Sequence, residues 1–332
     1  MKKILIVIVF LSRIISLYSQ YSPLPGWSGS DAISADSPLF REWGNRVTVI
    51  RGYINIADTT ATDNNSNRAS FGNPGDATGK PDGKIVSLGD SGIAIVYFDI
   101  PLCDGQGWDF AVFENGFILS DDTTKAFLEL ARVQVSSDSI HFFEFPPVSL
   151  TQTDTQTGAF DGLDTRKINN LAGKYPVLWG TPFDLSELDD SEFLDKNNIC
   201  CIKLIDVIGS IETNHYTNDV YGNKINDPFP TPYFSSGFDL DAVGAININE
   251  QAIGNYKDKP KIYPNPFDYK LNIIFTEKIL SVKIYDVSGK LLISNKSSEK
   301  KVSIDTSKLK SGLYFCIVKS ENFTFRLKAV KL

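Results

Sequence analysis

The sequence has few of the side chains that bind transition metals or act as bases, with 2 His, 4 Cys and 1 Met among 332 residues. His141 lies in a predicted hairpin and His215 in a polar segment, and no neighbouring pattern marks either as a catalytic base. The cysteines lack the paired spacing of a zinc site. A zinc centre is therefore not expected, and the sequence assigns no catalytic residue.

The cysteines also form no disulfide framework. Cys200 and Cys201 are adjacent, so on a regular strand their side chains point to opposite faces and at most one could reach Cys103. We expect no disulfide, with a bridge from Cys103 to Cys200 or Cys201 as the open alternative. Cys316 lies in the alternating segment LYFCIVKS, which predicts a buried thiol.

No apolar run approaches the roughly 18 uncharged residues of a membrane-spanning helix, so no transmembrane segment is expected. The N-terminal stretch MKKILIVIVFLSRIISLYSQ is interrupted by Arg13. Its two lysines, short apolar run and small polar end are typical of a secretory signal peptide. We expect residues 1–19 to be that signal, with cleavage near Ser19 and Gln20.

Charge is divided unevenly along the chain. Residues 20–258 hold 15 Lys and Arg against 34 Asp and Glu, a net of −19, whereas residues 259–332 hold 15 against 6, a net of +9. Nucleic acids and anionic membranes attract basic surfaces, so the acidic body excludes both as its partners. An acidic body does suit a protein that binds divalent cations.

Nearly every periodic segment alternates with a period of two, as in RVTVIRGYINI, SGIAIVYFDI and LELARVQVSS. Frequent strands separated by Gly, Asn, Asp and Pro predict an all-β protein made of sandwiches. We expect a large β-sandwich body at 20–249, a polar linker at 250–260 and a small domain at 261–332. Long loops are expected at 57–84, 147–197 and 210–237, and a hairpin at 136–145.

The C-terminal segment contains ordered landmarks: a Tyr-Pro-Asn-Pro opening, a Tyr-Asp-x-x-Gly-Lys turn, a Leu-x-x-Gly-x-Tyr turn and a basic last strand. Two hairpins are expected, around Ser288-Gly289 and around Glu321-Asn322. These motifs closely resemble the type A C-terminal sorting domain of the type IX (Por) secretion system, which has an immunoglobulin-like β-sandwich. The residues that carry this resemblance are Tyr263, Pro264, Asn265, Pro266, Asp286, Gly289, Gly312 and Tyr314.

The resemblance implies transport across the outer membrane by the type IX machinery. It further implies removal of the sorting domain by a sortase-type protease, followed by release or by attachment to surface lipopolysaccharide. The expected location is therefore extracellular or attached to the cell surface.

The body resembles a group of secreted bacterial cell surface proteins through segments such as SLGDSGIAIVYFDIPLCDGQGWDFAVFENGF and DPFPTPYFSSGFDLDAVGAI. Where that group usually has a Ser-x-Asp-Gly turn, this chain has Ser139. The order of elements is similar to the galactose-binding (discoidin-type) jelly roll common in carbohydrate-binding modules. In such jelly rolls a structural calcium often lies between an early loop and the final strand.

Asp239 and Asp241 sit two apart in the final predicted strand of the body, so both carboxylates are expected on one face. An unpaired buried carboxylate is costly. The pair could therefore accept backbone hydrogen bonds, share a Ca²⁺ ion or remain solvated. Ca²⁺ prefers six to eight hard oxygen ligands, and Asp58 and Asp63 are the early-loop partners we consider. Glu114, Asp109 and Asp206 are interpreted as hydrogen-bonded anchors.

Two classes of function stay open, together with a purely structural role. The first is a binding module for a glycan or another nutrient, in which aromatic side chains stack on the ligand. The candidates for that role are Trp108, Tyr175, Trp179 and Tyr233. The second is an extracellular polysaccharide hydrolase, which needs two facing carboxylates about 5–10 Å apart in a cleft.

Overall fold

The computed structural model describes residues 21–212, 214–249, 259–320 and 324–332. The expected signal peptide, its cleavage point and nearly all of the expected linker lie outside these ranges. The chain divides after Ile248 into two compact units, here called the body and the tail. The described residues contain strands and three short 3₁₀ turns but no α-helix, which confirms the all-β prediction.

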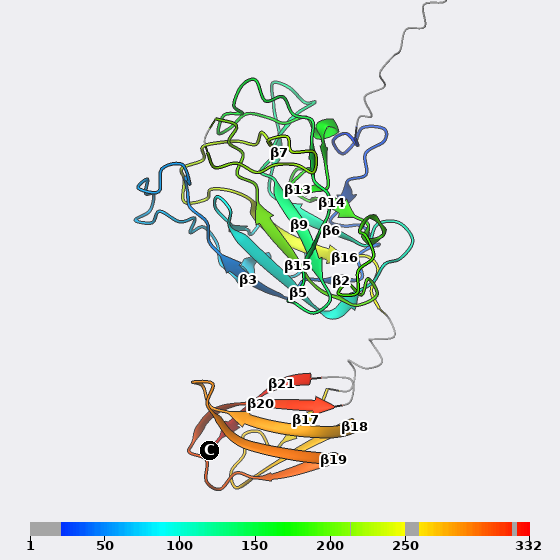
Figure 1. Ribbon diagram of the computed structural model, residues 1–332, viewed down its shortest axis with the longest axis vertical. Coiled ribbons are helices and arrows are strands. Elements are labelled where there is room, and N and C mark those ends of the chain that lie inside the picture. The colour runs from blue at the N-terminus through cyan, green and yellow to red at the C-terminus, as the bar shows by residue number, and fades with distance from the viewer. Residues whose placement is uncertain (1–20, 213, 250–258, 321–323) are drawn as a thin grey trace, which may run out of the picture. The chain divides into compact units, whose positions relative to one another are not determined.

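The body is built from two six-stranded sheets (Figure 1). The first sheet has the order β1 (Ile33–Ser34), β14 (Trp179–Phe183), β6 (Phe110–Glu114), β16 (Asp239–Ala245) and β2 (Glu42–Trp43), and β4 (Val86–Ser87) also pairs with β16. The second has the order β10 (Phe143–Glu144), β9 (Ala131–Ser136), β15 (Ile199–Asp206), β5 (Ile93–Leu102) and β3 (Arg46–Ile50), and β13 (Leu171–Ala172) pairs with β9.

Two small sheets of two strands each lie outside these sheets: β7 (Phe117–Ile118) pairs with β8 (Ala126–Phe127), and β11 (Val148–Ser149) pairs with β12 (Ile168–Asn169). All pairings between named strands of the body are antiparallel. The 3₁₀ turns are Pro74–Ala77, Thr165–Lys167 and Leu185–Glu187.

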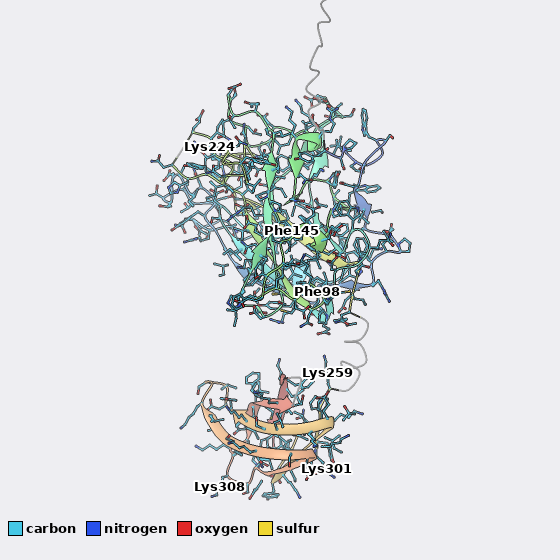
Figure 2. The ribbon with its side chains drawn as sticks, turned by 45° about the vertical axis from the view of Figure 1, so that its right-hand side comes forward. Phe98, Phe145, Lys224, Lys259, Lys301 and Lys308 are labelled. Carbon is cyan, nitrogen blue, oxygen red and sulfur yellow. The ribbon has the colours of Figure 1, made fainter. Side chains whose placement is uncertain are left out.

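The two sheets of the body pack face to face through aromatic rings. The ring centroid of Phe110 on β6 lies 5.1 Å from that of Phe183 on β14 and 5.8 Å from that of Phe145, which follows β10 in the other sheet. All three side chains are buried, and Figure 2 labels Phe145 inside the body. Alternating strands therefore bury one face here, as a sandwich requires.

The first sheet is buried on its outer face as well. Residues Ile33, Phe113 and Ala242 belong to a second apolar cluster, against which Phe40 and Trp43 pack. As a result every residue of β16 is buried. The N-terminal segment of the body thus acts as a cover, and β16 becomes an interior strand on both faces.

One predicted loop is wrong in part. The range 147–197 was expected to be a loop, but it contains β14, which pairs with both β1 and β6. The segment WGTPF does not alternate, and Pro182 would normally argue against a central strand. Because β14 is buried along most of its length, its small and apolar residues need no alternation.

The tail is one five-stranded antiparallel sheet. Its strands are β17 (Lys261–Tyr263), β18 (Lys270–Tyr285), β19 (Leu291–Asp305), β20 (Gly312–Ser320) and β21 (Thr324–Lys331). The first part of β18 pairs with β17 and its last part with β20, while β19 follows β18 along most of its length. The sheet curls around the tail's own core, which includes Leu271, Val282 and Cys316 (Figure 1).

Alternation is clear along β18, where buried residues recur at every second position except near Ile279 and Ser281, between which the strand pairing is irregular. Lysines of the tail such as Lys301 and Lys308 are exposed (Figure 2). The β18–β19 hairpin turns at Gly289, which has φ 83°, so this prediction is confirmed. β20 and β21 pair as expected, although their turn at 321–323 lies outside the described residues.

Candidate functional site

An exposed row of aromatic rings crosses the surface of the body; we call it the aromatic ridge. Its members are Phe117, Phe127, Phe160 and Tyr233. Neighbouring ring centroids are 5.1 Å apart for Phe117 and Phe127, 6.1 Å for Phe127 and Phe160, and 5.9 Å for Phe160 and Tyr233. The side chains of Phe117, Phe160 and Tyr233 are 50%, 65% and 44% exposed.

The ridge is assembled from segments far apart in sequence. β7 and β8 supply Phe117 and Phe127, and the loops around residues 160 and 233 supply the other two rings. β7 lies among the loops at one end of the body (Figure 1). Contiguous exposed apolar surface of this kind marks an interaction site more often than a scattered single residue does.

Three buried carboxylates lie next to the strands that carry the ridge; we call them the carboxylate cluster. One carboxylate oxygen from each of Glu114, Glu129 and Asp239 lies within 4.8 Å of the corresponding oxygens of the other two residues. None of the three residues is more than 6% exposed. Glu114 is three residues before Phe117, and Glu129 is two residues after Phe127. β7 and β8 therefore connect the ridge directly to the cluster.

The hydrogen bonds of the cluster are incomplete. Glu114 Oε2 accepts a hydrogen bond from the Gly116 N–H at 2.7 Å, whereas the buried Oε1 has no partner among the described residues. Asp239 accepts hydrogen bonds from the Ser87 hydroxyl and the Asn115 side chain. A fully buried carboxylate oxygen without a donor is costly, which points to a ligand that is a cation or a proton.

The electrostatics of the cluster agree with this geometry. Burial, and then repulsion from Asp239, raises the pKa of Glu114 and of Glu129 well above the usual range. Burial likewise raises the pKa of Asp239 to about 7, against the opposing effects of its hydrogen bonds and the positive charge of Arg51. Three acids thus share a space that does not favour three negative charges.

The structure separates the predicted pair of aspartates. Asp239 joins the cluster, whereas Asp241 accepts backbone hydrogen bonds from Asp82 at 3.2 Å and Gly83 at 3.1 Å. The register of β16 against β6 shifts between Leu240 and Ala242, so regular strand spacing does not hold at this point.

The early-loop aspartates have other contacts. Asp58 accepts hydrogen bonds from Thr60, and Asp63 accepts one from the Phe234 N–H. Neither belongs to a group of three potential metal ligands among the described residues.

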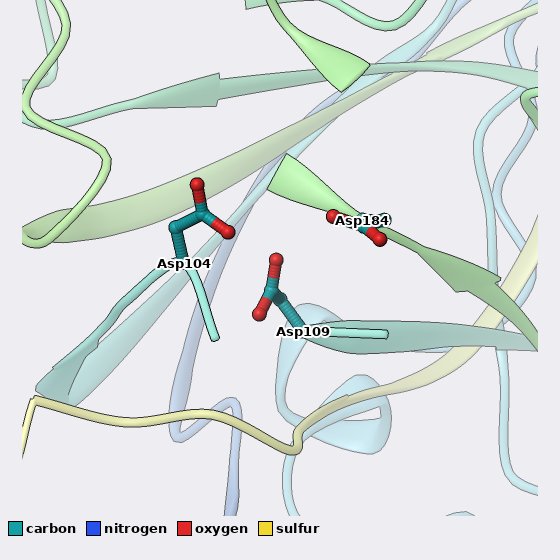
Figure 3. A group of neighbouring side chains, drawn as sticks. All are labelled: Asp104, Asp109 and Asp184. Carbon is teal, nitrogen blue, oxygen red and sulfur yellow. The ribbon is translucent and has the colours of Figure 1, made fainter. Parts of the chain in front are cut away.

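A second acidic group lies elsewhere in the body, where Asp104, Asp109 and Asp184 face one another from the ends of neighbouring segments (Figure 3). Asp109 is buried, but both its oxygens accept hydrogen bonds, from the backbone of Gly105 and Leu185 and from the Asn247 side chain. Asp109 thus holds loops together and differs from Glu114 in having hydrogen-bond donors at both oxygens.

Asp206 is another carboxylate that acts as an anchor. Its two oxygens accept hydrogen bonds from the backbone of Ser91 at 2.9 Å and Phe238 at 2.6 Å. Asp206 and Asp109 thus have the anchoring role that their positions predicted.

Of the four predicted ligand-binding aromatics, Tyr233 alone belongs to the ridge. Tyr175 is fully buried and its hydroxyl donates a hydrogen bond to Asp31, so its ring is part of the core and cannot stack on a ligand. Trp108 packs against the outer apolar cluster of the first sheet. Trp179 is half-buried on β14.

The sorting-motif residues hold the tail's turns and edges. Asn265 accepts a hydrogen bond from the Val330 N–H and donates one to the Lys328 carbonyl, which ties the opening motif to β21. Asp286 caps the β18–β19 turn by accepting hydrogen bonds from Ser288 and Lys290. The Tyr314 hydroxyl donates to the Lys310 carbonyl at 2.6 Å.

The rest of the motif lies at the same turns and edge. Tyr263 ends β17 and is followed by Pro264, Asn265 and Pro266, both prolines after cis peptide bonds. Gly312, at the start of β20, has a φ of 150°.

Comparison with known proteins identifies the tail. Residues 261–331 match the family described as "Secretion system C-terminal sorting domain". The protein is therefore exported by the type IX (Por) secretion system across the outer membrane to the cell surface. No helix within the described ranges has the length and hydrophobicity that a membrane crossing needs. No curated protein matches the chain.

Several solved structures show weak similarity. One is PorZ, a surface component of the type-IX secretion system of Porphyromonas gingivalis, with 12% identity, 82% of this chain and 47% of that chain covered, and a TM-score of 0.22. Another contains the CBM51-2 and INT domains of Clostridium perfringens ZmpB, with 10% identity, 88% and 82% covered, and a TM-score of 0.19. A third is a β-glucuronidase of Ruminococcus gnavus, with 10% identity, 89% and 45% covered, and a TM-score of 0.19.

The chain spans about half the length of PorZ. TM-scores this low carry no argument about fold or function.

Proposed function

We propose that the protein is a surface-delivered binding module whose body captures a glycan on the aromatic ridge. The observation that carries this proposal is the row of four neighbouring rings, three of them well exposed. Apolar faces of sugar rings pack on flat aromatic side chains, and ring spacings of 5–6 Å let one extended chain contact several rings in turn.

A polysaccharide hydrolase is less well supported. Such an enzyme needs two carboxylates that face a substrate cleft. The acids of the carboxylate cluster are close enough to one another but almost completely buried, so a sugar chain cannot reach them. The ridge lies on the surface and its rings have no acid–base chemistry, which favours binding over cleavage.

We further propose that the carboxylate cluster holds a structural Ca²⁺ ion. Three carboxylates supply up to six oxygens, and Ca²⁺ accepts six to eight. A divalent cation would neutralise the mutual repulsion of the acids and give Glu114 Oε1 a partner. Because Glu114 and Glu129 flank β7 and β8, the ion would hold the base of the ridge.

Export supplies the setting for this function. The sorting domain would be removed by a sortase-type protease after transport, and the body would then be released or attached to surface lipopolysaccharide. A glycan-binding body in that position would hold a nutrient or a matrix polysaccharide at the cell surface.

The test is a glycan array with the full chain, followed by calorimetric titration of any glycan that binds. Phe160→Ala should weaken binding about tenfold, since removal of a central contact ring commonly costs more than 1 kcal/mol. Tyr221→Ala is the matched control, because Tyr221 is 74% exposed but outside the ridge. Equal affinities for the two variants, or no binding to any glycan, would contradict the proposal.

A further inference from the structure

The adjacent cysteines of β15 lie beneath the β9–β10 hairpin and have no part in the proposed glycan binding. No disulfide joins the cysteines, yet the Sγ atoms of Cys200 and Cys201 are only 3.8 Å apart. Adjacent residues on a regular strand point to opposite faces, and this was the expectation from the sequence. That expectation is wrong because the pairing of β15 with β5 is irregular between Ile199 and Cys201.

Ser139 in the hairpin connection faces both thiols. Its Oγ lies 3.3 Å from the Cys200 Sγ and 3.6 Å from the Cys201 Sγ. Ser139 has φ 65°, a conformation that a non-glycine residue adopts at a cost. Cys200 Sγ also donates a hydrogen bond to the Ser136 carbonyl at 3.3 Å. The hairpin thus places a hydroxyl and a carbonyl around a pair of sulfurs.

The two thiols differ in accessibility and acidity. Cys200 is half-buried, whereas Cys201 is fully buried. The hydrogen bond between the two thiols, together with that to Ser139, lowers the pKa of Cys200 to about 6, and the same interaction together with burial raises the pKa of Cys201. The titratable groups nearby are Asp138 and His141, whose side chains lie 2.7 Å apart, and Lys203, which acts on Cys201.

We propose that Cys200 and Cys201 form a thiol–disulfide exchange site whose substrate is a small external disulfide. The thiolate of Cys200 attacks one sulfur of the disulfide, forms a mixed disulfide and releases one thiolate. Cys201 then attacks the Cys200 sulfur, and its proton passes to the departing sulfur. The second half of the external disulfide leaves as a thiol, and a Cys200–Cys201 disulfide remains. The two cysteines together give up two electrons, and the external disulfide accepts both.

The geometry assigns separate roles to the two residues. Cys200 is the attacking thiol because it is the more accessible and more acidic of the two. Cys201 is the resolving thiol because it is buried and already in contact with the Cys200 sulfur. A small disulfide is required, since Cys200 is itself half-buried under the hairpin.

The experiment treats the full chain with 2-hydroxyethyl disulfide at neutral pH and follows each cysteine by peptide mass spectrometry. In the unaltered chain the peptide with both cysteines should lose two hydrogen atoms and retain no probe. Cys201→Ser should stop at the mixed disulfide on Cys200. Cys200→Ser should leave Cys201 unmodified. Thermal melting shows in parallel that each variant is folded.

Cys103 is the internal control, because it is also half-buried but has no adjacent cysteine. Cys200 should react at least about tenfold faster than Cys103. Faster reaction at Cys103, a Cys103–Cys200 bridge, or a mixed disulfide that persists on Cys200 in the unaltered chain would each overturn the proposal.

Ser139 is a positioning residue, and Ser139→Gly removes its hydroxyl while relaxing the backbone. The rate of Cys200 modification as a function of pH should shift to higher pH in this variant, because a hydrogen bond to the thiolate is lost. The melting temperature should not fall. An unshifted pH profile would overturn the role of the hydroxyl in activating the pair.

Discussion

The buried carboxylates of the body and the exposed carboxylates of the tail respond to their surroundings in opposite ways. In the body Glu114 and Asp239 are buried, and burial raises the pKa of each. In the tail Asp286 and Asp305 are exposed, and hydrogen bonds from nearby residues lower the pKa of each. The exposed Asp286 and Asp305 of the tail thus stabilise turns as anions, whereas burial in the folded body disfavours the charged form of Glu114 and Asp239.

The sequence separation of the contacts explains the difference. Asp286 bonds to Ser288, two residues away, whereas Asp241 bonds to the Asp82 N–H, 159 residues away. Local contacts recur wherever the motif recurs, so they can be read in a sequence. Long-range contacts depend on the whole topology.

The largest expected effect comes from removal of the tail. Deletion of residues 261–332 should abolish surface delivery, because the sorting domain directs export, and should leave the body in the periplasm. Surface labelling and cell fractionation measure this. The unaltered chain is the control. Normal amounts of the truncated body at the surface would contradict the prediction.

The second prediction concerns the carboxylate cluster. A bound Ca²⁺ stabilises the folded body by about 2.7 kcal/mol at a hundredfold excess of free ion over its Kd, so chelation should lower the melting temperature by about 5–10 °C. Asp239→Asn should abolish that response. Asp241→Asn is the matched control: it weakens two backbone hydrogen bonds and should lower the melting temperature equally with calcium and with chelator.

Two outcomes would count against the ion. Identical melting of the unaltered chain with calcium and with chelator would mean that protons, not Ca²⁺, relieve the repulsion. An equal loss of the calcium response in Asp239→Asn and Asp241→Asn would mean that the ion lies nearer to Asp241 than the cluster does.

The smallest expected effect is on pH dependence. Burial raises the pKa of Asp90 to about 6 from an ordinary value of 3.8. Between these values the folded body binds more protons than the unfolded chain, so its free energy of unfolding falls as pH rises. Asp90→Asn keeps an oxygen for the Ile56 N–H and should stabilise the body by about 1–3 kcal/mol at pH 7.

The same experiment contrasts the two regions. In the tail, stability from Asp286 and Asp305 is present above their unfolded pKa and is lost as pH falls through the lowered folded values. Denaturation of the chain and of Asp90→Asn between pH 4 and 7 measures the trend in the body, and extension of the series to about pH 2 measures the trend in the tail. Ser70→Ala, which alters an exposed side chain that does not titrate, is the control and should not change the slope over this range.

Much of the fold could be predicted because alternation and turn residues report local structure. The β18–β19 hairpin was predicted from Ser288 and Gly289, and the strands β3, β5 and β9 from their period of two. β14 was missed because a strand buried along most of its length does not alternate. The contact of Cys200 with Cys201 was missed because two adjacent cysteines in a sequence do not reveal that the strand pairing around them is irregular.

The candidate site was predicted only in fragments. Asp239 and Tyr233 were named, but Glu129, Phe117, Phe127 and Phe160 were not. One signal was available for Glu129, since an acid inside the apolar segment LELARV is unusual for a buried strand. For Phe160 there was none, because its role depends on Phe127 and Tyr233, which lie 33 and 73 residues away.

The position of β16 in the chain has a consequence for quality control. β16 fills the place between β6 and β2, and it is the last strand of the body before the sorting domain begins. The sorting domain is therefore synthesised only after β16, the strand that completes the body. A chain that ends before β16 has an incomplete first sheet and no sorting domain, so such a chain should remain in the periplasm.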